Sequence, residues 1–114
     1  LNKNSEVKSG IATATTGFAI MDTETSIKKI GNIITVIMVI KADAVFPDVT
    51  TTVATLPGGF RPAKNINYMC RGSNTQWSTD GIMYMYISVD GPIMIKQFGG
   101  TSFKYASIHC TFIS

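Results

Sequence analysis

The sequence predicts an all-β domain, built as a compact antiparallel β-sandwich or barrel of jelly-roll or Greek-key type. Two observations support this prediction. The chain is rich in Thr, Ile, Val, Tyr and Phe and contains only two Glu, which is a composition typical of strands. Apolar or alternating runs also follow one another with turn residues between them, a pattern that indicates about eight short strands.

The length of 114 residues fits one domain, and an apolar share of 45% is enough for a core. Residues 1–8 are polar and unpatterned, so we expect them to be a linker or the end of a stalk. We expect residues 9–114 to form a single β domain. Charged residues make up 15% of the chain, against about 25% in ordinary soluble domains. This depletion suggests that other copies of the chain cover part of the surface.

The first third of the chain predicts short strands over 9–15, 18–21 and 26–30, broken by Gly17 and by a polar turn at 22–25. The strongest strand signal comes next, over residues 33–40, which are apolar at nearly every position. β-Branched residues dominate this run and argue against a helix.

The apolar run 33–40 also predicts that both faces of its strand are covered. In a small antiparallel domain the core covers one face of the sheet. The second cover would then be another sheet or a neighbouring subunit.

A sharp corner is predicted where the strand 49–56 meets the run 57–62, Pro-Gly-Gly-Phe-Arg-Pro. The first proline cannot donate to a ladder, the two glycines can adopt positive φ, and the last proline forces Arg61 to be extended. We expect Phe60 to be substantially buried and one of the two glycines to have positive φ.

The remaining strands are expected over 65–71, 82–89, 92–98 and 103–113, with a two-residue hairpin turn at Asp90-Gly91. Alternation places the residues of each strand on two faces. In 65–71 one face carries Ile66, Tyr68 and Cys70, and the other Asn67 and Met69. In 103–113 the inward set is Ile108, Cys110 and Phe112, which leaves Tyr105, Ser107, His109 and Thr111 on the opposite face.

Two parts of the sequence resemble a known family. They are the corner, Thr-Val-Ala-Thr-Leu-Pro-Gly-Gly-Phe-Arg-Pro, and a C-terminal hairpin that ends in Phe-Ile-Ser. This family comprises the head domains that close the receptor-binding proteins and tail fibres of bacteriophages infecting Gram-positive hosts. The resemblance is clearest from Gly31 to Ser114. It implies the same β fold, assembled as a trimer around the fibre axis, and a trimer would cover the second face of the strand 33–40.

The resemblance further implies a protein of the virion, at the tail tip or in a fibre. Its partners would be a host cell-wall saccharide and, through an N-terminal part, other tail or baseplate proteins. No cofactor is implied.

Other function classes find little support. The net charge of +3 comes from scattered lysines and arginines rather than the basic stripe that nucleic-acid binding needs. The longest apolar run is far shorter than the about 20 residues of a membrane span. A single His and the absence of a Cys-x-x-Cys spacing argue against zinc, and no catalytic motif is present. We therefore expect neither an enzyme, nor a metal site, nor membrane insertion.

Weaker candidates for chemistry remain. Asp22 and Glu24 would share a face if extended, as a glycosidase requires, but they lie in a polar stretch typical of a solvated turn. Asp43 and Asp48 lack a third nearby acid for calcium. The two cysteines, at positions 70 and 110, are interpreted as buried free thiols, with a disulfide as the alternative.

The polar loop 72–81 is the strongest candidate site because it holds the single tryptophan, Trp77. Sugar binding combines an aromatic face with planar polar groups that bond hydroxyls. The predicted ligand-binding residues are Arg71, Asn74, Gln76, Trp77, Asp80 and His109. Arg71 could also pair with a phosphate of a polyol-phosphate or a phosphorylated saccharide. In the alternative interpretation Trp77 packs on the core and His109 is an ordinary strand residue.

Three tyrosines, Tyr84, Tyr86 and Tyr105, offer a second aromatic patch or, more simply, sheet packing at cross-strand spacing. The functional hypothesis is a head domain that adheres to host cell-surface carbohydrate. The alternative is a structural trimerising cap or baseplate connector without a ligand. A polysaccharide-cleaving enzyme is the third and weakest hypothesis.

Overall fold

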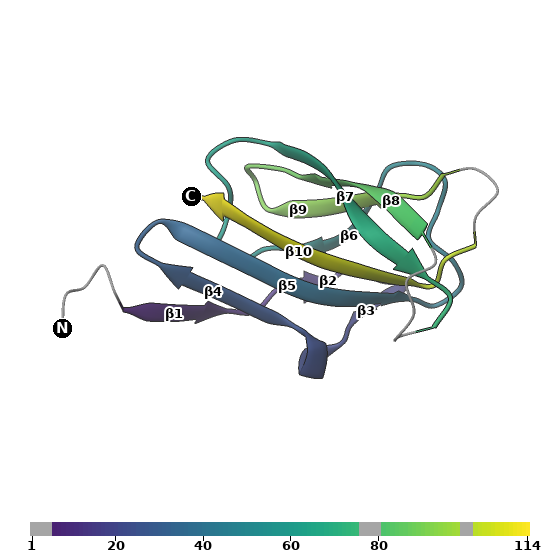
Figure 1. The fold of residues 1–114 in the computed structure, drawn as a ribbon, viewed down its shortest axis with the longest axis horizontal. Helices are drawn as coiled ribbons and strands as arrows, with labels where there is room; N and C mark the ends of the chain where they lie inside the picture. Colours follow the sequence, from purple (N-terminus) through teal and green to yellow (C-terminus); the bar gives the residue numbers. More distant parts are fainter. Residues whose placement is uncertain (1–5, 76–80, 99–101) are drawn as a thin grey trace.

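The structure, a computed structural model, describes residues 6–75, 81–98 and 102–114 (Figure 1). Ten strands form a single antiparallel sheet, and the described residues contain no α-helix, only one 3-10 turn at Asp22–Glu24. The strands are β1 (Val7–Gly10), β2 (Thr13–Ala14), β3 (Phe18–Ile20), β4 (Ser26–Ile30), β5 (Ile33–Ala42), β6 (Thr51–Thr55), β7 (Ile66–Ser73), β8 (Gly81–Ile87), β9 (Pro92–Lys96) and β10 (Tyr105–Ile113). The prediction of a compact antiparallel all-β fold is confirmed.

The sheet follows the order β1-β4-β5-β10-β7-β8-β9-β6-β2, and β3 pairs with the end of β5 that β4 leaves free. β2 also lies beside β3, so the sheet curls until its far strands meet. Figure 1 shows β4 and β5 along one side, β7, β8 and β9 along the other, and β10 between them. The last strand of the chain is thus a central strand of the sheet.

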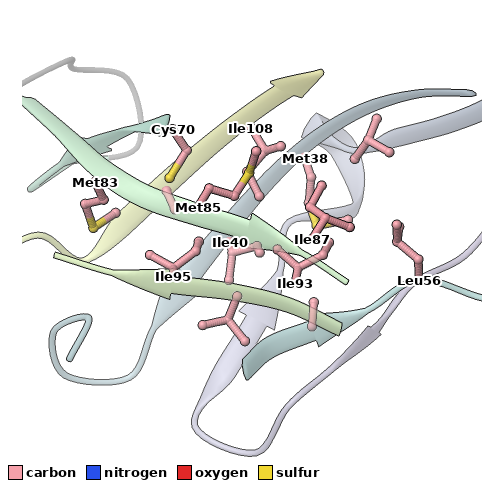
Figure 2. Close-up of a cluster of buried hydrophobic side chains, with 14 of the residues drawn as sticks. Met38, Ile40, Leu56, Cys70, Met83, Met85, Ile87, Ile93, Ile95 and Ile108 are labelled. Atoms are coloured by element: carbon pink, nitrogen blue, oxygen red, sulfur yellow. The ribbon is translucent and has the colours of Figure 1, made fainter. Parts of the chain in front are cut away.

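Alternating side chains fill the interior of this curl (Figure 2). β5 contributes Ile34, Val36, Met38 and Ile40, all fully buried, and β9 contributes Ile93 and Ile95. From β10, Ile108 and Phe112 are buried and Cys110 is half-buried, so the predicted inward set of this strand is confirmed.

The second face of β5 is open. Ile33 and Ile37 point away from the core and are 51% and 41% exposed. Residues 33–40 were expected to be covered on both faces, but nothing in the described part of the chain covers these two outward side chains. A single sheet curled on itself has one interior, and that interior takes only every second residue of β5.

The backbone of the corner at 57–62 is as predicted, whereas Phe60 is less buried than expected. Gly59 has a φ of +86°, and Phe60 is half-buried against Gly10, where an added Cβ would lie 3.0 Å from the ring. Arg61 Nε donates to the carbonyl oxygen of Leu56 at 3.2 Å, and Pro62 is buried. The arginine therefore reaches back across the corner and closes it.

Several strand boundaries differ from the prediction. The expected strand 9–15 is divided between β1 and β2. β8 ends at Ile87 instead of residue 89, because the amide of Val89 donates to Asn65 Oδ1 at 2.9 Å and leaves the ladder. The turn before β9 consequently spans 88–91, closed by a bond from the Gly91 amide to the Ser88 carbonyl at 3.0 Å.

Both cysteines are free thiols, as the first of the two interpretations predicted. Burial raises the pKa of the Cys70 thiol to about 12 and that of Cys110 to about 11. They act as small apolar residues of the interior rather than as reactive groups.

Candidate functional site

The outward side chains of β1, β4, β5 and β10 are arranged in rows, because these antiparallel strands keep their register. The first row holds Val7, Ile30, Ile33 and Ile113, each directly opposite its neighbour and each exposed. We call this set the aliphatic row.

A polar row follows directly, made of Ser9, Lys28, Thr35 and Thr111. Lys28 Nζ donates to Ser9 Oγ at 2.6 Å, and the hydroxyls of Thr35 and Thr111 lie 3.3 Å apart. Beyond it, Ile37 pairs with His109.

Two of the predicted site residues, Arg71 and His109, share this outer face. Arg71 of β7 is exposed and lies opposite Ser107 of β10. His109 is the next outward residue along β10 and is also exposed. Asn74 is exposed directly after the end of β7. Gln76, Trp77 and Asp80 lie outside the described residues, so their role stays a prediction.

The residues at the two ends of the loop 72–81 are held by packing and by backbone hydrogen bonds. The Phe103 ring packs against Gly72 and Gly81, and the Phe103 amide donates to Gln97 Oε1 at 3.1 Å. The Lys104 amide donates to the Ser73 carbonyl at 3.0 Å. Phe103 and Lys104 therefore hold the end of β7 and the start of β8 in place.

A groove on the outside of β7, β8 and β9 was not predicted. Its volume is about 760 Å³, and its walls are formed by Thr50, Asn67, Tyr68, Met69, Tyr84, Met85, Tyr86, Met94 and Lys96. Cross-strand pairing explains the set: Met69 lies opposite Tyr84, which lies opposite Lys96, while Asn67, Tyr86 and Met94 form the next row. We call this hollow the tyrosine groove.

Tyr84 is the central ring of the tyrosine groove. It is 48% exposed, its centroid lies 4.4 Å from that of Phe98, and Lys96 Nζ lies 6.0 Å from it. Tyr105 lies elsewhere, opposite Lys41 of β5, whose Nζ is 5.9 Å from its ring. The three tyrosines therefore do not form one patch. Tyr84 packs at cross-strand spacing, as the simpler interpretation expects, and also forms part of the groove wall.

The sequence contained a signal for this groove. Alternation in 82–89 already places Tyr84 and Tyr86 on one face, and the strand 65–71 places Asn67 and Met69 opposite the inward Cys70. What the sequence lacks is the pairing of these strands. β7 pairs with β10 at residues 71–73, so Tyr68 lies beyond the contact and stays 61% exposed.

Among the described residues, no three His, Cys, Asp or Glu side chains gather closely enough to hold a metal ion. Asp22 and Glu24 lie in the 3-10 turn, as the solvated-turn interpretation expects. The described part of the chain also contains no helix long and apolar enough to cross a membrane.

No model of a protein family and no curated protein matches the chain. Two solved structures share its fold. The head domain of lactococcal phage bIL170, from a study of the receptor-binding domains of lactococcal phages, superposes with a TM-score of 0.71 at 14% identity, covering 95% of this chain and 98% of that one. The receptor-binding protein gp15 of Listeria phage PSA gives a TM-score of 0.64 at 22% identity, over 97% of this chain and 68% of that one. The chain therefore has the fold of phage receptor-binding heads.

Proposed function

We propose that this domain is the receptor-binding head of a bacteriophage tail protein, located in the virion tail, and that it adheres to carbohydrate on the host cell surface. One observation carries the proposal: nearly the whole chain superposes on the complete head domain of phage bIL170. A fold by itself hosts many functions, so the surface must supply the rest of the argument.

The outer face offers groups that suit a saccharide. The guanidinium of Arg71 and the imidazole of His109 are exposed on neighbouring strands and can donate to hydroxyl or phosphate oxygens. Asn74 stands at the base of the loop that contains Trp77. The proposed contacts are Arg71, Asn74, Gln76, Trp77, Asp80 and His109.

We further propose that the domain is a homotrimer and that the aliphatic row, with Ile37, lies in the subunit interface. Exposed aliphatic side chains aligned across neighbouring strands form an apolar patch of the kind that marks protein contacts. Trimerisation would also repeat a weak saccharide site three times, which raises the adhesion of the whole particle through avidity. The polar residues before β1 would be the end of a stalk that leads to other tail or baseplate proteins, whereas Val7 and Lys8, which were expected in that linker, belong to β1 and pair with β4.

The second candidate function is a structural trimerising cap or connector without a ligand. The aliphatic row favours it specifically, because its side chains offer nothing but apolar surface to a partner. The two candidates differ in whether the domain binds cells.

Binding of the fluorescently labelled domain to a panel of lactococcal and Listeria strains tests the proposal. We expect binding that periodate oxidation of the cells abolishes and that protease treatment leaves intact. Trp77→Ala should remove it without lowering the melting temperature, and Arg71→Ala and His109→Ala should weaken it. Binding that protease removes and periodate spares would refute the carbohydrate receptor. A trimer that binds no strain would favour the structural cap.

A further inference from the structure

We infer that the tyrosine groove is itself a saccharide site, and that it takes a sugar unit carrying an anionic substituent, with the sugar ring on Tyr84 and the anion at Lys96. This inference rests on the proposed receptor-binding function and adds a site separate from the loop 72–81.

The position of Tyr84 supports stacking. Phe98 packs on the tyrosine ring with centroids 4.4 Å apart and planes tilted by 50°, so the ring is held in place from one side. Nearly half of the Tyr84 side chain remains exposed and forms part of the groove wall. A ring that is both fixed and accessible offers an apolar surface to the C–H face of a sugar at little cost in side-chain entropy.

The polar groups of the groove suit hydroxyls. Asn67 and Tyr86 lie directly opposite each other, one row away from Tyr84, and Thr50 adds a hydroxyl to the wall. These side chains supply amide and hydroxyl groups that both donate and accept hydrogen bonds. The volume of about 760 Å³ is within the range of about 300–1,000 Å³ that small-ligand sites occupy.

The charge of the groove indicates which kind of substituent the bound sugar carries. Lys96 is the one charged residue among the described residues that form its walls, and no carboxylate is among them. Lys96 Nζ lies at 6.0 Å from the Tyr84 centroid, at the outer limit of a cation–π contact, so this contact holds the ammonium only loosely over the ring. A carboxylate or phosphate on a sugar stacked at Tyr84 would therefore meet an available cation.

A subunit interface fits this groove less well than a sugar does. The aliphatic row is purely apolar, whereas the tyrosine groove mixes rings, an amide, hydroxyls and a lysine around a hollow. Lysine is depleted at the cores of protein interfaces. The two surfaces lie on different strands, so one can hold the subunits together while the other stays open to the host.

Methionine methyl groups provide a direct test, because Met69 and Met94 form part of the groove and Met38 lies in the core. The domain labelled with 13C at its six methionine methyls is titrated with uronic-acid-bearing and phosphate-bearing oligosaccharides and with their neutral counterparts. We expect the Met69 and Met94 signals to shift with the anionic probes while Met38 stays fixed. The two anionic arms distinguish carboxylate from phosphate. No shift at Met69 and Met94 with any probe at millimolar concentration overturns the inference.

Matched variants sharpen the result. Tyr84→Ala should weaken binding of the anionic probe by about tenfold or more, as truncation of a central aromatic anchor does. Lys96→Gln should erase the preference for anionic over neutral probes. The controls are Tyr105→Ala and Lys41→Gln, a second tyrosine–lysine pair of the same geometry on other strands, which should leave binding unchanged. If the variants of both tyrosine–lysine pairs lose binding of the anionic probe equally, the inference is overturned.

The test also separates this site from the proposed function. If Tyr84→Ala binds the probes and host cells as the parent does, whereas Trp77→Ala or Arg71→Ala does not, the tyrosine groove is excluded and the carbohydrate receptor stands. If Tyr84→Ala converts a trimer into a monomer in native mass spectrometry, the groove is a subunit interface and the inference fails.

Discussion

The ring of Phe103 occupies the space that a side chain would need at Gly72. A Cβ built at Gly72 would overlap the ring, and one built at Gly81 would come within 2.8 Å of its Cζ atom. Gly72 and Gly81 are the end residues of the predicted polar loop, and the structure places them in β7 and β8 as the two walls of a slot. These glycines are therefore required for packing, because only a residue without a Cβ leaves room for the Phe103 ring.

Gly72→Ala should destabilise the domain by about 1–3 kcal/mol, because the buried phenylalanine must move to admit a methyl group. Urea unfolding followed by circular dichroism measures the change. Gly58→Ala is the control, since a Cβ at Gly58 meets nothing within 4 Å. Equal midpoints for Gly72→Ala and the parent would show that Phe103 does not fill this slot.

Gly59→Ala tests the corner through the backbone alone. Gly59 has a φ of +86° with open space around it, whereas Gly58 has the same open space without a positive φ. Alanine at 59 should therefore cost about 1–2 kcal/mol, the penalty of a left-handed residue, and alanine at 58 should be neutral or slightly stabilising. Thermal unfolding of the two variants in parallel gives the comparison, and indistinguishable melting temperatures would contradict it.

Ile33→Asp should convert the proposed trimer into monomers. It places a charge in the middle of the aliphatic row, and an interface that buries it would leave that charge unpaired. Val49→Asp, at a similarly exposed aliphatic residue outside the row, should leave the assembly unchanged. Sedimentation velocity at micromolar concentration measures the oligomeric state of both variants. A parent protein that is already monomeric would refute the trimer, and an Ile33→Asp trimer would place the interface elsewhere.

Stability should fall at alkaline pH because of Cys70. Its pKa is raised to about 12 by burial, against 9.0 for an ordinary thiol, so between these values the unfolded chain releases a proton that the folded chain retains. Proton release on unfolding favours the unfolded state as pH rises, by up to about 1.4 kcal/mol for each pH unit above 9.

Urea midpoints at pH 8, 9.5 and 10.5 measure this loss, with Cys70→Ala as the comparison. The difference in unfolding free energy between parent and Cys70→Ala should shift against the parent as pH rises. A difference that stays constant would mean that the thiol ionises equally in both states.

The fold was largely predictable from local patterns, since each predicted strand depends on the period-2 alternation of its own residues. The corner was also predictable, because proline and glycine restrict the backbone in ways that no distant contact changes. Strand ends were less predictable where a distant group competes for the ladder, as Asn65 does for the Val89 amide.

The surface was the least predictable part. Tyr84 was expected either in an aromatic patch or in sheet packing, because a single strand does not reveal which strands lie beside it. The groove exists only through the rows that join β7, β8 and β9. Ile33 and Ile37 likewise suggested a second cover within or outside the chain, and only the topology shows that the chain itself leaves them open.

The central position of β10 constrains the order in which the domain can be made. β10 joins β5 to β7, so before residues 105–113 leave the ribosome the sheet exists at most as two separate halves, each with a long unpaired edge. The complete sheet can therefore form only after these residues have been made, and a break in β10 would separate the two halves of the sheet. Because β10 links the two halves, the aliphatic row on one half and the tyrosine groove on the other both depend on this one strand being in place.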